Sequence, residues 1–243
     1  MFTTRGDATY IIDAVNINFP DARLTLQDIE SSWAGLRPLI HEEGKSASEL
    51  SRKDEIFESS SGLISIAGGK LTGYRKMAER VVSLVIKKYF EERPLKKCQT
   101  SEITLTEKAI RSTKEVAKFI GSVKDRIKPY NFPPHTARYL VENYGFQANY
   151  ILSDFEKLKS DVDPDLALLK AELSFCLRYE MVCTLLDFFV RRTGMINFDI
   201  HRVQKWKNEI LAECKIYFNW SEETSRLEMK KLEDQLKAIT TFQ

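Results

Sequence analysis

Two adjacent glycines, Gly68 and Gly69, separate a short apolar run from a long segment with helical periodicity. The run at residues 63–67 reads LISIA and predicts a β-strand that is bounded by turn residues. The segment after the glycines predicts a helix to about Phe90, because its apolar side chains recur along one face. These apolar residues are Met77, Val81, Val82, Val85 and Tyr89. A strand that turns through two glycines into a helix indicates a mixed α/β segment.

The remaining residues before about 93 also mix helical and extended signals. They predict, in order, the start of an amphipathic helix at 9–16, a turn at 20–23, a strand at 28–39, a polar loop at 41–51, a short strand at 56–58 and a hairpin-like turn at 59–62. Pro38 suits the end or the edge of a strand, because proline has no N–H to donate to a ladder.

From about residue 100 onward the signals are almost entirely helical. Helices are predicted from Thr106 to Ile127, from Pro133 and Pro134 to Gly145, from Pro164 through Phe188 as one helix or a pair, and from caps at Asp199 and Ser221. We therefore predict an α+β fold. A partial α/β segment at residues 1–93 is followed by an all-α helical C-terminal domain, a helical bundle, at residues 94–243.

Composition excludes several classes of protein. The net charge of +2 gives no bulk field for nucleic acid, and 43% hydrophobic residues exclude intrinsic disorder. No apolar run approaches the ~20 residues of a transmembrane helix, and the start has no signal-peptide core. Three scattered histidines and four cysteines without a Cys-x-x-Cys pair predict no metal site. We expect Cys176 and Cys183 to be buried reduced thiols on one helix face, which indicates a reducing, cytoplasmic environment.

The chemistry of the chain is expected at the glycine turn. A helix that begins after two glycines presents unpaired N–H groups and the positive end of its dipole, so it favours an anion. The turn is not a phosphate loop, since Ile64 occupies the position that needs the first glycine, and no Gly-x-Gly-x-x-Gly fingerprint occurs. Lys70 together with Arg37 and Arg52 would suit a phosphorylated anion if the three converge. A tight turn with solvated cations is the alternative.

Four longer stretches resemble one enzyme family. Residues 31–39 read SSWAGLRPL, residues 50–56 LSRKDEI, residues 64–79 ISIAGGKLTGYRKMAE and residues 187–194 DFFVRRTG. In order and spacing they resemble the aerobic, FAD-dependent glycerol-3-phosphate dehydrogenase family, and in particular its Gram-positive bacterial members. Residues 1–93 would be the C-terminal part of the FAD-binding and substrate domain, of the glycine-oxidase type. Residues 94–243 would be the helical C-terminal domain.

The resemblance implies an activity and a set of site residues. Such an enzyme oxidises sn-glycerol 3-phosphate to dihydroxyacetone phosphate, reduces FAD and passes electrons to membrane quinone. Arg37 would be catalytic and lie beside the flavin and the reacting carbon, while Arg52 and Lys70 would bind the substrate with it. The cofactor-binding residues would be Gly68, Gly69, Lys70, Leu71 and Thr72. The resemblance also suggests a homodimer on the inner face of the cell membrane.

Several expectations qualify this interpretation. The related glycerophosphate oxidase of lactic bacteria uses oxygen and carries a long insertion, whereas only 14 residues separate Arg37 from Arg52 here, so the dehydrogenase is favoured. The family's N-terminal dinucleotide fingerprint and catalytic histidine have no counterpart. The chain therefore resembles the C-terminal portion of a longer protein, and we expect it to bind FAD poorly and to be inactive alone.

A non-catalytic alternative comes from the basic segment at residues 107–128. It holds seven basic and three acidic residues, which would suit a helical module that binds a membrane or another partner. Arg191 and Arg192, near the end of an apolar helix, are expected to make structural contacts.

Overall fold

The structure is a computed structural model that describes residues 2–36, 40, 44, 53–105, 110–160 and 162–242. The chain forms two compact units. Unit 1 comprises Met1–Ala34 and Ile110–Gln243, and unit 2 comprises Gly35–Ala109. This division differs from the predicted domains, because the first 34 residues pack with the helical part of the chain. The assignment of residues 1–93 to a flavin domain and of 94–243 to a helical domain stays a prediction.

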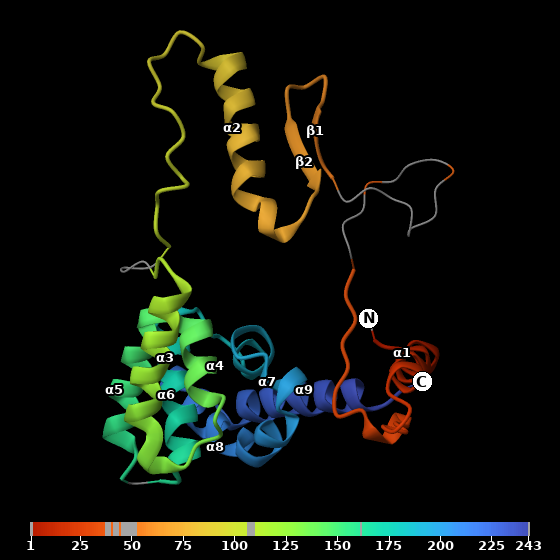
Figure 1. Cartoon of the computed structure of the whole chain (residues 1–243), viewed down its shortest axis with the longest axis vertical. Helices are drawn as coiled ribbons and strands as arrows, with labels where there is room; N and C mark the ends of the chain where they lie inside the picture. Colours follow the sequence, from red (N-terminus) through yellow and green to blue (C-terminus); the bar gives the residue numbers. More distant parts are fainter. Residues whose placement is uncertain are drawn as a thin grey trace. The chain divides into compact units, whose positions relative to one another are not determined.

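Unit 2 holds a β-hairpin and one long helix (Figure 1). Its elements are β1 (Asp54–Glu58), β2 (Ile64–Gly68), the 3-10 helix η2 (Leu71–Gly73) and α2 (Tyr74–Tyr89). β1 and β2 are antiparallel, and Ile56 lies opposite Ile66. The predicted hairpin and the predicted helix after the two glycines are confirmed, since the extended, turn and helical signals follow one another without conflict.

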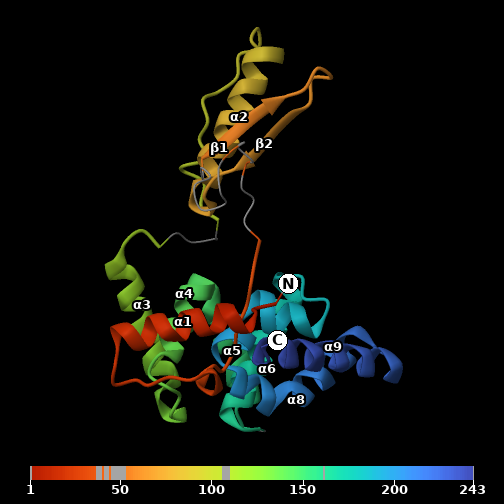
Figure 2. The same cartoon turned by 90° about the vertical axis from the view of Figure 1, so that its right-hand side faces the viewer.

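One face of the hairpin is joined to α2 by two ion pairs, and both views of the structure show the hairpin beside this helix (Figure 1 and Figure 2). Asp54 pairs with Arg80 at 2.5 Å, and Glu58 pairs with Lys88. Because side chains alternate along a strand, Ile56 lies on the same face as these two carboxylates. Phe57 therefore lies on the opposite face of the sheet, where it is exposed.

Unit 1 is helical and contains the hydrophobic core of the described chain. Its elements are α1 (Arg5–Asn18), η1 (Leu26–Asp28), α3 (Thr113–Ile127), η3 (Lys128–Tyr130), α4 (Thr136–Tyr144), η4 (Gly145–Gln147), α5 (Ala148–Leu158), α6 (Pro164–Tyr179), the π-helix η5 (Asp187–Arg192), α7 (Met195–Phe198), α8 (Ile200–Phe218) and α9 (Glu222–Thr240). Four phenylalanines are fully buried in this core, Phe155, Phe175, Phe188 and Phe189. The predicted α+β fold class with a helical C-terminal part is confirmed.

Side-chain caps determine where most of these helices begin. The Asp199 carboxylate and the Ser221 hydroxyl accept hydrogen bonds from the first turns of α8 and α9, as predicted. The predicted start of the basic helix at Thr106 lies outside the described residues. α3 begins at Thr113, because the Ser112 hydroxyl accepts a 3.2 Å hydrogen bond from the Glu115 N–H. Residues 110–112 are not helical, so the predicted helix was too long.

The predicted strand at residues 28–39 is wrong for its described part. Asp28 ends η1, and residues 29–36 have no regular secondary structure. Two hydroxyls instead attach this segment to helix ends: Ser31 Oγ donates to the Ile196 carbonyl and Ser32 Oγ to the Ile239 carbonyl, both at 3.0 Å. The extended pattern was compatible with a strand, but its described neighbours are helices. Residues 37–39 lie outside the described residues.

The cysteines are only partly as predicted. Cys176 and Cys214 are buried, whereas Cys98 and Cys183 are exposed. Cys183 does not share a helix face with Cys176, because α6 ends at Tyr179 and the chain continues irregularly to Thr184. Burial raises the pKa of the Cys214 thiol to about 12.

Two kinds of feature are absent from the residues that the structure describes. Among them no helix has the length and apolar character needed to cross a bilayer. The same residues contain no cluster of three or more His, Cys, Asp or Glu that would hold a metal ion.

Candidate functional site

The two glycines form the turn between β2 and α2, and each has a backbone conformation that other residues rarely adopt. Their φ angles are +75° for Gly68 and +86° for Gly69. A Cβ on Gly68 would lie 2.5 Å from the Lys53 carbonyl oxygen, and one on Gly69 would lie 2.7 Å from the Met77 sulfur. The positive φ favours glycine at both positions, and at Gly68 the Lys53 backbone also leaves no room for a Cβ, independently of any ligand.

The start of the following helix is electrostatically open to an anion. The Gly73 N–H donates to the Lys70 carbonyl at 2.8 Å, which closes the 3-10 turn in front of α2. The first N–H groups of a helix have no partner inside it. α2 has no side-chain cap and no acidic residue in its first turn, so nothing in that turn neutralises the positive end of the dipole. This geometry supports the predicted preference for negative charge.

The side chains of the turn are accessible. Lys70, Leu71 and Thr72 are all exposed, and Leu71 is 90% exposed. Within the described residues the Lys70 ammonium forms no ion pair. Backbone N–H groups, one cation and one hydroxyl are therefore available to a ligand, and they suit the flat, partly anionic part of a flavin or a phosphate group.

The structure describes only one of the three predicted cations, Lys70. Arg37 and Arg52 lie outside the described residues, so their convergence with Lys70 stays a prediction. Lys53, the residue after Arg52, has its carbonyl oxygen beside the Cβ position of Gly68. The chain therefore lies against the glycine turn at Lys53.

Sequence reasoning missed the role of Met77 at this site. Its sulfur lies against Gly69, so it supports the turn from α2. The helical periodicity predicted that Met77 is apolar and inward-facing. No sequence signal indicated that it would limit the side chain at Gly69, because the two residues meet only when the turn folds back.

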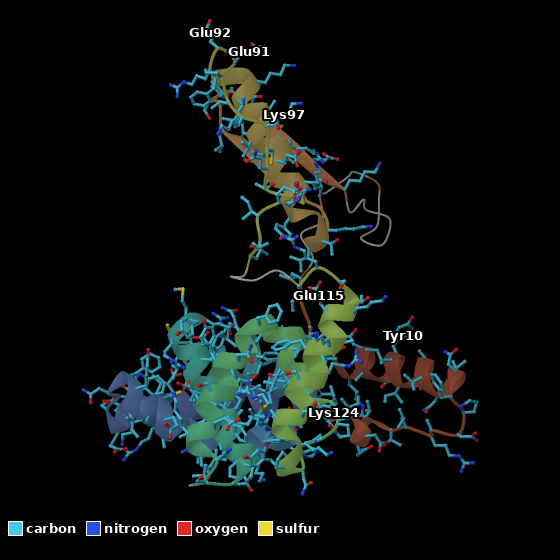
Figure 3. All side chains as sticks on the ribbon, turned by 60° about the vertical axis from the view of Figure 1, so that its left-hand side comes forward. Tyr10, Glu91, Glu92, Lys97, Glu115 and Lys124 are labelled. Carbon is cyan, nitrogen blue, oxygen red and sulfur yellow. The ribbon has the colours of Figure 1, made fainter. Side chains whose placement is uncertain are left out.

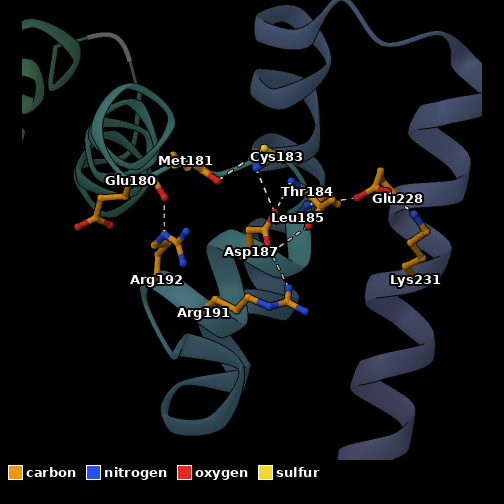
Figure 4. A network of polar contacts seen from close by, with 10 residues as sticks. All are labelled: Glu180, Met181, Cys183, Thr184, Leu185, Asp187, Arg191, Arg192, Glu228 and Lys231. Atoms are coloured by element: carbon orange, nitrogen blue, oxygen red, sulfur yellow. Dashed lines mark hydrogen bonds and ion pairs between the residues drawn. The ribbon is translucent and has the colours of Figure 1, made fainter. Parts of the chain in front are cut away.

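Residues 187–194, one of the stretches that carried the family resemblance, take part in a network of polar contacts (Figure 4). Arg191 pairs with Asp187 at 2.9 Å, and Arg192 donates from Nε to the Glu180 carbonyl at 2.5 Å. These contacts confirm the predicted structural role of both arginines. Burial raises the Asp187 pKa, but hydrogen bonds from Thr184 and from the backbone N–H of Cys183 outweigh it and lower the pKa below the ordinary value.

Together these features define a class of protein. It has a small mixed α/β unit, in which a strand–glycine–helix turn is open to an anionic ligand, and a helical unit with its own core. Comparisons with known proteins identify the family. Residues 98–225 match the family model described as the C-terminal domain of alpha-glycerophosphate oxidase, and the chain belongs to this family.

Curated relatives that match more of the chain support the same family assignment. The aerobic glycerol-3-phosphate dehydrogenase of Bacillus subtilis (strain 168) is 40% identical over 235 residues, which are 94% of this chain and 42% of the relative. The Staphylococcus saprophyticus protein of the same name is 42% identical over 212 residues, 84% of this chain and 37% of the relative. The family resemblance predicted from the motifs is confirmed.

A solved structure extends the similarity to the whole chain. The X-ray structure of the glycerol-3-phosphate dehydrogenase from Bacillus halodurans, complexed with FAD, has a TM-score of 0.80 and 39% identity. The match covers 100% of this chain and 47% of that one. The chain thus spans about two fifths of the length of its curated relatives and about half of the solved one.

Proposed function

We propose that this chain supplies the substrate-side segment and the helical domain of an FAD-dependent glycerol-3-phosphate dehydrogenase. The reaction is the oxidation of sn-glycerol 3-phosphate to dihydroxyacetone phosphate. The observation that carries this proposal is the glycine turn between β2 and α2, with its positive helix end and exposed Lys70. The names of the relatives and the FAD complex of the solved one support it.

The turn fits the cofactor. When FAD is bound, it supplies the two-electron acceptor for the substrate. The backbone N–H groups of Gly69, Lys70, Leu71 and Thr72 would hold the part of the flavin that gains negative charge, because the positive end of α2 stabilises charge there. Gly68 would set the direction in which the chain leaves β2.

The cations would hold the substrate. In this proposal Lys70 and Arg52 bind the phosphate group through charge-assisted hydrogen bonds. Arg37 is the catalytic residue that orients the reacting carbon next to the flavin. A guanidinium stays charged at every working pH, so its contribution is position and charge.

The acceptor and the location follow from the family resemblance. We propose membrane quinone as the electron acceptor, with oxygen as the alternative, and a homodimeric protein at the cytoplasmic face of the membrane. α3 supports a surface contact of this kind. It carries Lys114, Lys118 and Lys124, and Lys128 follows it; none of the four forms an ion pair within the described residues. Lys124 is labelled on α3 in Figure 3.

The membrane contact has a direct test. Sedimentation with anionic vesicles is expected to pull down the chain at low salt and to lose it at high salt, because exposed charges are screened. Replacing Lys118 and Lys124 by glutamine should reduce the bound fraction. Equal binding to neutral vesicles, or no binding at low salt, would contradict a basic membrane surface on α3.

The dehydrogenase function is tested in a chimera. This chain replaces the matching part of the Bacillus halodurans enzyme, and flavin content and dye-coupled oxidation of glycerol 3-phosphate are measured. We expect stoichiometric flavin and turnover. Lys70→Gln should raise the KM for glycerol 3-phosphate about tenfold or more with little change in flavin content, because one charged hydrogen bond is lost.

Lys87→Gln is the matched control, since Lys87 is an exposed lysine in the last turn of α2, far along that helix from the glycine turn. A chimera that binds flavin but does not oxidise glycerol 3-phosphate would contradict the proposed reaction. An equal KM in both variants would contradict the role of Lys70. The chain by itself is expected to purify without stoichiometric flavin and without turnover.

A further inference from the structure

One wall of the glycine turn carries a carboxylate. Asp54, the first residue of β1, lies opposite Gly68 in the antiparallel register. Its Cβ atom is 3.1 Å from the position that a Cβ on Gly69 would take. The Asp54 side chain therefore lies directly beside the turn whose N–H groups are proposed to hold the flavin. A free negative charge at this place would oppose the preference of the turn for an anion.

Asp54 is paired with a cation from the neighbouring helix. Arg80 on α2 approaches it with 2.5 Å between Nη1 and Oδ2. The Asp54 side chain is only 19% exposed, so water screens its charge poorly and the guanidinium supplies the compensation. Glu79, a second carboxylate on the first half of α2, pairs with Arg75 and Lys76. Each of these two carboxylates is thus matched by a cation.

We propose that Arg80 is a positioning residue of the flavin site, which it serves by masking the charge of Asp54. This inference rests on the proposed function. The flavin gains negative charge when it is reduced, and the positive end of α2 stabilises that charge. An unmasked carboxylate beside Gly69 would cancel part of this stabilisation, so the reduced form would be less favoured and the reduction potential would fall.

A second ion pair in unit 2 provides a matched control. Glu58 at the other end of β1 pairs with Lys88, so it joins the same strand to the same helix. Glu58 lies opposite Ile64, four residues or about 13 Å along the sheet from the Asp54–Gly68 pair. Loss of Lys88 would weaken the packing of the hairpin against α2 without leaving a bare charge at the glycine turn.

The test is the reduction potential of the flavin bound to the chimera described above, measured by spectroscopic titration against a reference dye. Arg80→Gln should disfavour the reduced form about tenfold, which lowers the potential of a two-electron couple by about 30 mV. Asp54→Asn should raise the potential. The double variant Asp54→Asn/Arg80→Gln, and Lys88→Gln, should each leave the equilibrium within about twofold of wild type.

A second measurement on the full 243-residue chain needs no flavin. Base-catalysed hydrogen exchange of an exposed N–H slows when a negative charge is brought near it, whereas loosening of the turn would speed it. The N–H groups of residues 70–72 should therefore exchange about threefold more slowly in Arg80→Gln and faster in Asp54→Asn. Lys88→Gln should leave their exchange rates unchanged.

The outcomes separate this inference from the proposed function. Faster exchange in Arg80→Gln, an unchanged potential, or an equal fall of the potential in Lys88→Gln would overturn the masking role. A double variant that keeps the low potential of Arg80→Gln would also overturn it. The expected shifts in a chimera that does not oxidise glycerol 3-phosphate would support the role of Arg80 and refute the proposed reaction. Normal turnover with an unchanged potential in Arg80→Gln would do the reverse.

Discussion

The Tyr144 hydroxyl donates a 2.6 Å hydrogen bond to Oε1 of Glu172 in the core of unit 1. Tyr139 donates to the same oxygen at 2.6 Å, so two phenols on α4 hold one carboxylate on α6. Glu172 is 1% exposed. Burial raises its pKa, and the two tyrosine hydrogen bonds oppose that rise only in part. The network ties two helices together through a group whose charged form is costly to bury.

Glu172→Gln should remove a pH dependence of stability. A carboxyl with a raised pKa binds its proton more tightly in the folded state, so its stabilisation is complete below the unfolded pKa and is lost as pH rises through the folded pKa. The wild-type melting temperature should therefore fall more between pH 5 and pH 8 than that of the variant. Glu142→Gln, on the exposed face of α4, is the control. Parallel pH profiles of wild type and Glu172→Gln would contradict this explanation.

Gly69→Ala should destabilise unit 2 by about 1–3 kcal/mol, because alanine is strained at positive φ and its Cβ would meet the Met77 sulfur. Hydrogen exchange of β2 and α2 measures the loss. Gly121→Ala is the control, and we expect it to stabilise the protein, since a Cβ at this position in α3 meets nothing within 4 Å. It should stabilise α3 by about 0.5–1 kcal/mol. Equal effects of the two changes would show that the turn does not require glycine.

Asp187→Asn should lower stability at neutral pH and lose that effect in acid. The folded-state pKa of Asp187 is lowered, so its contribution is present above the unfolded pKa and disappears as pH falls through the folded value. The melting temperatures of wild type and Asp187→Asn, measured at pH 7 and at pH 3, test this expectation. Asp125→Asn on α3 serves as a surface control. A difference between wild type and Asp187→Asn that persists unchanged at pH 3 would refute the charge-based explanation.

Ser32→Ala should release the segment that runs along unit 1. It removes the hydrogen bond to the Ile239 carbonyl, one of the last carbonyls of α9, at a cost of about 0.5–1.5 kcal/mol. Faster hydrogen exchange at residues 30–34 and at the end of α9 is the expected signature. Ser32→Thr keeps the hydroxyl and should restore protection. An unchanged exchange rate in Ser32→Ala would show that the other contacts hold the segment without it: the Ser31 hydrogen bond to Ile196 and the Trp33 ring, 5.4 Å from that of Phe198.

Local signals determined the elements that depend on neighbours in the sequence. The hairpin and α2 followed from strand and helix periodicity on either side of Gly68 and Gly69, and α8 and α9 followed from their caps at Asp199 and Ser221. These features are encoded within a few residues, because a cap hydrogen bond and a helical repeat need no distant partner.

Tertiary structure decided everything that needs a partner far along the chain. Residues 29–36 read as a strand, but their hydroxyls reach Ile196 and Ile239, and an extended segment pairs only where another strand lies beside it. The tyrosines that bind Glu172 are 28 and 33 residues away from it. At the site, the sequence by itself determined a glycine turn with a positive helix end. Only the fold decided that the Lys53 backbone excludes a Cβ at Gly68 and that Met77 packs against Gly69, because these contacts arise where the chain returns on itself.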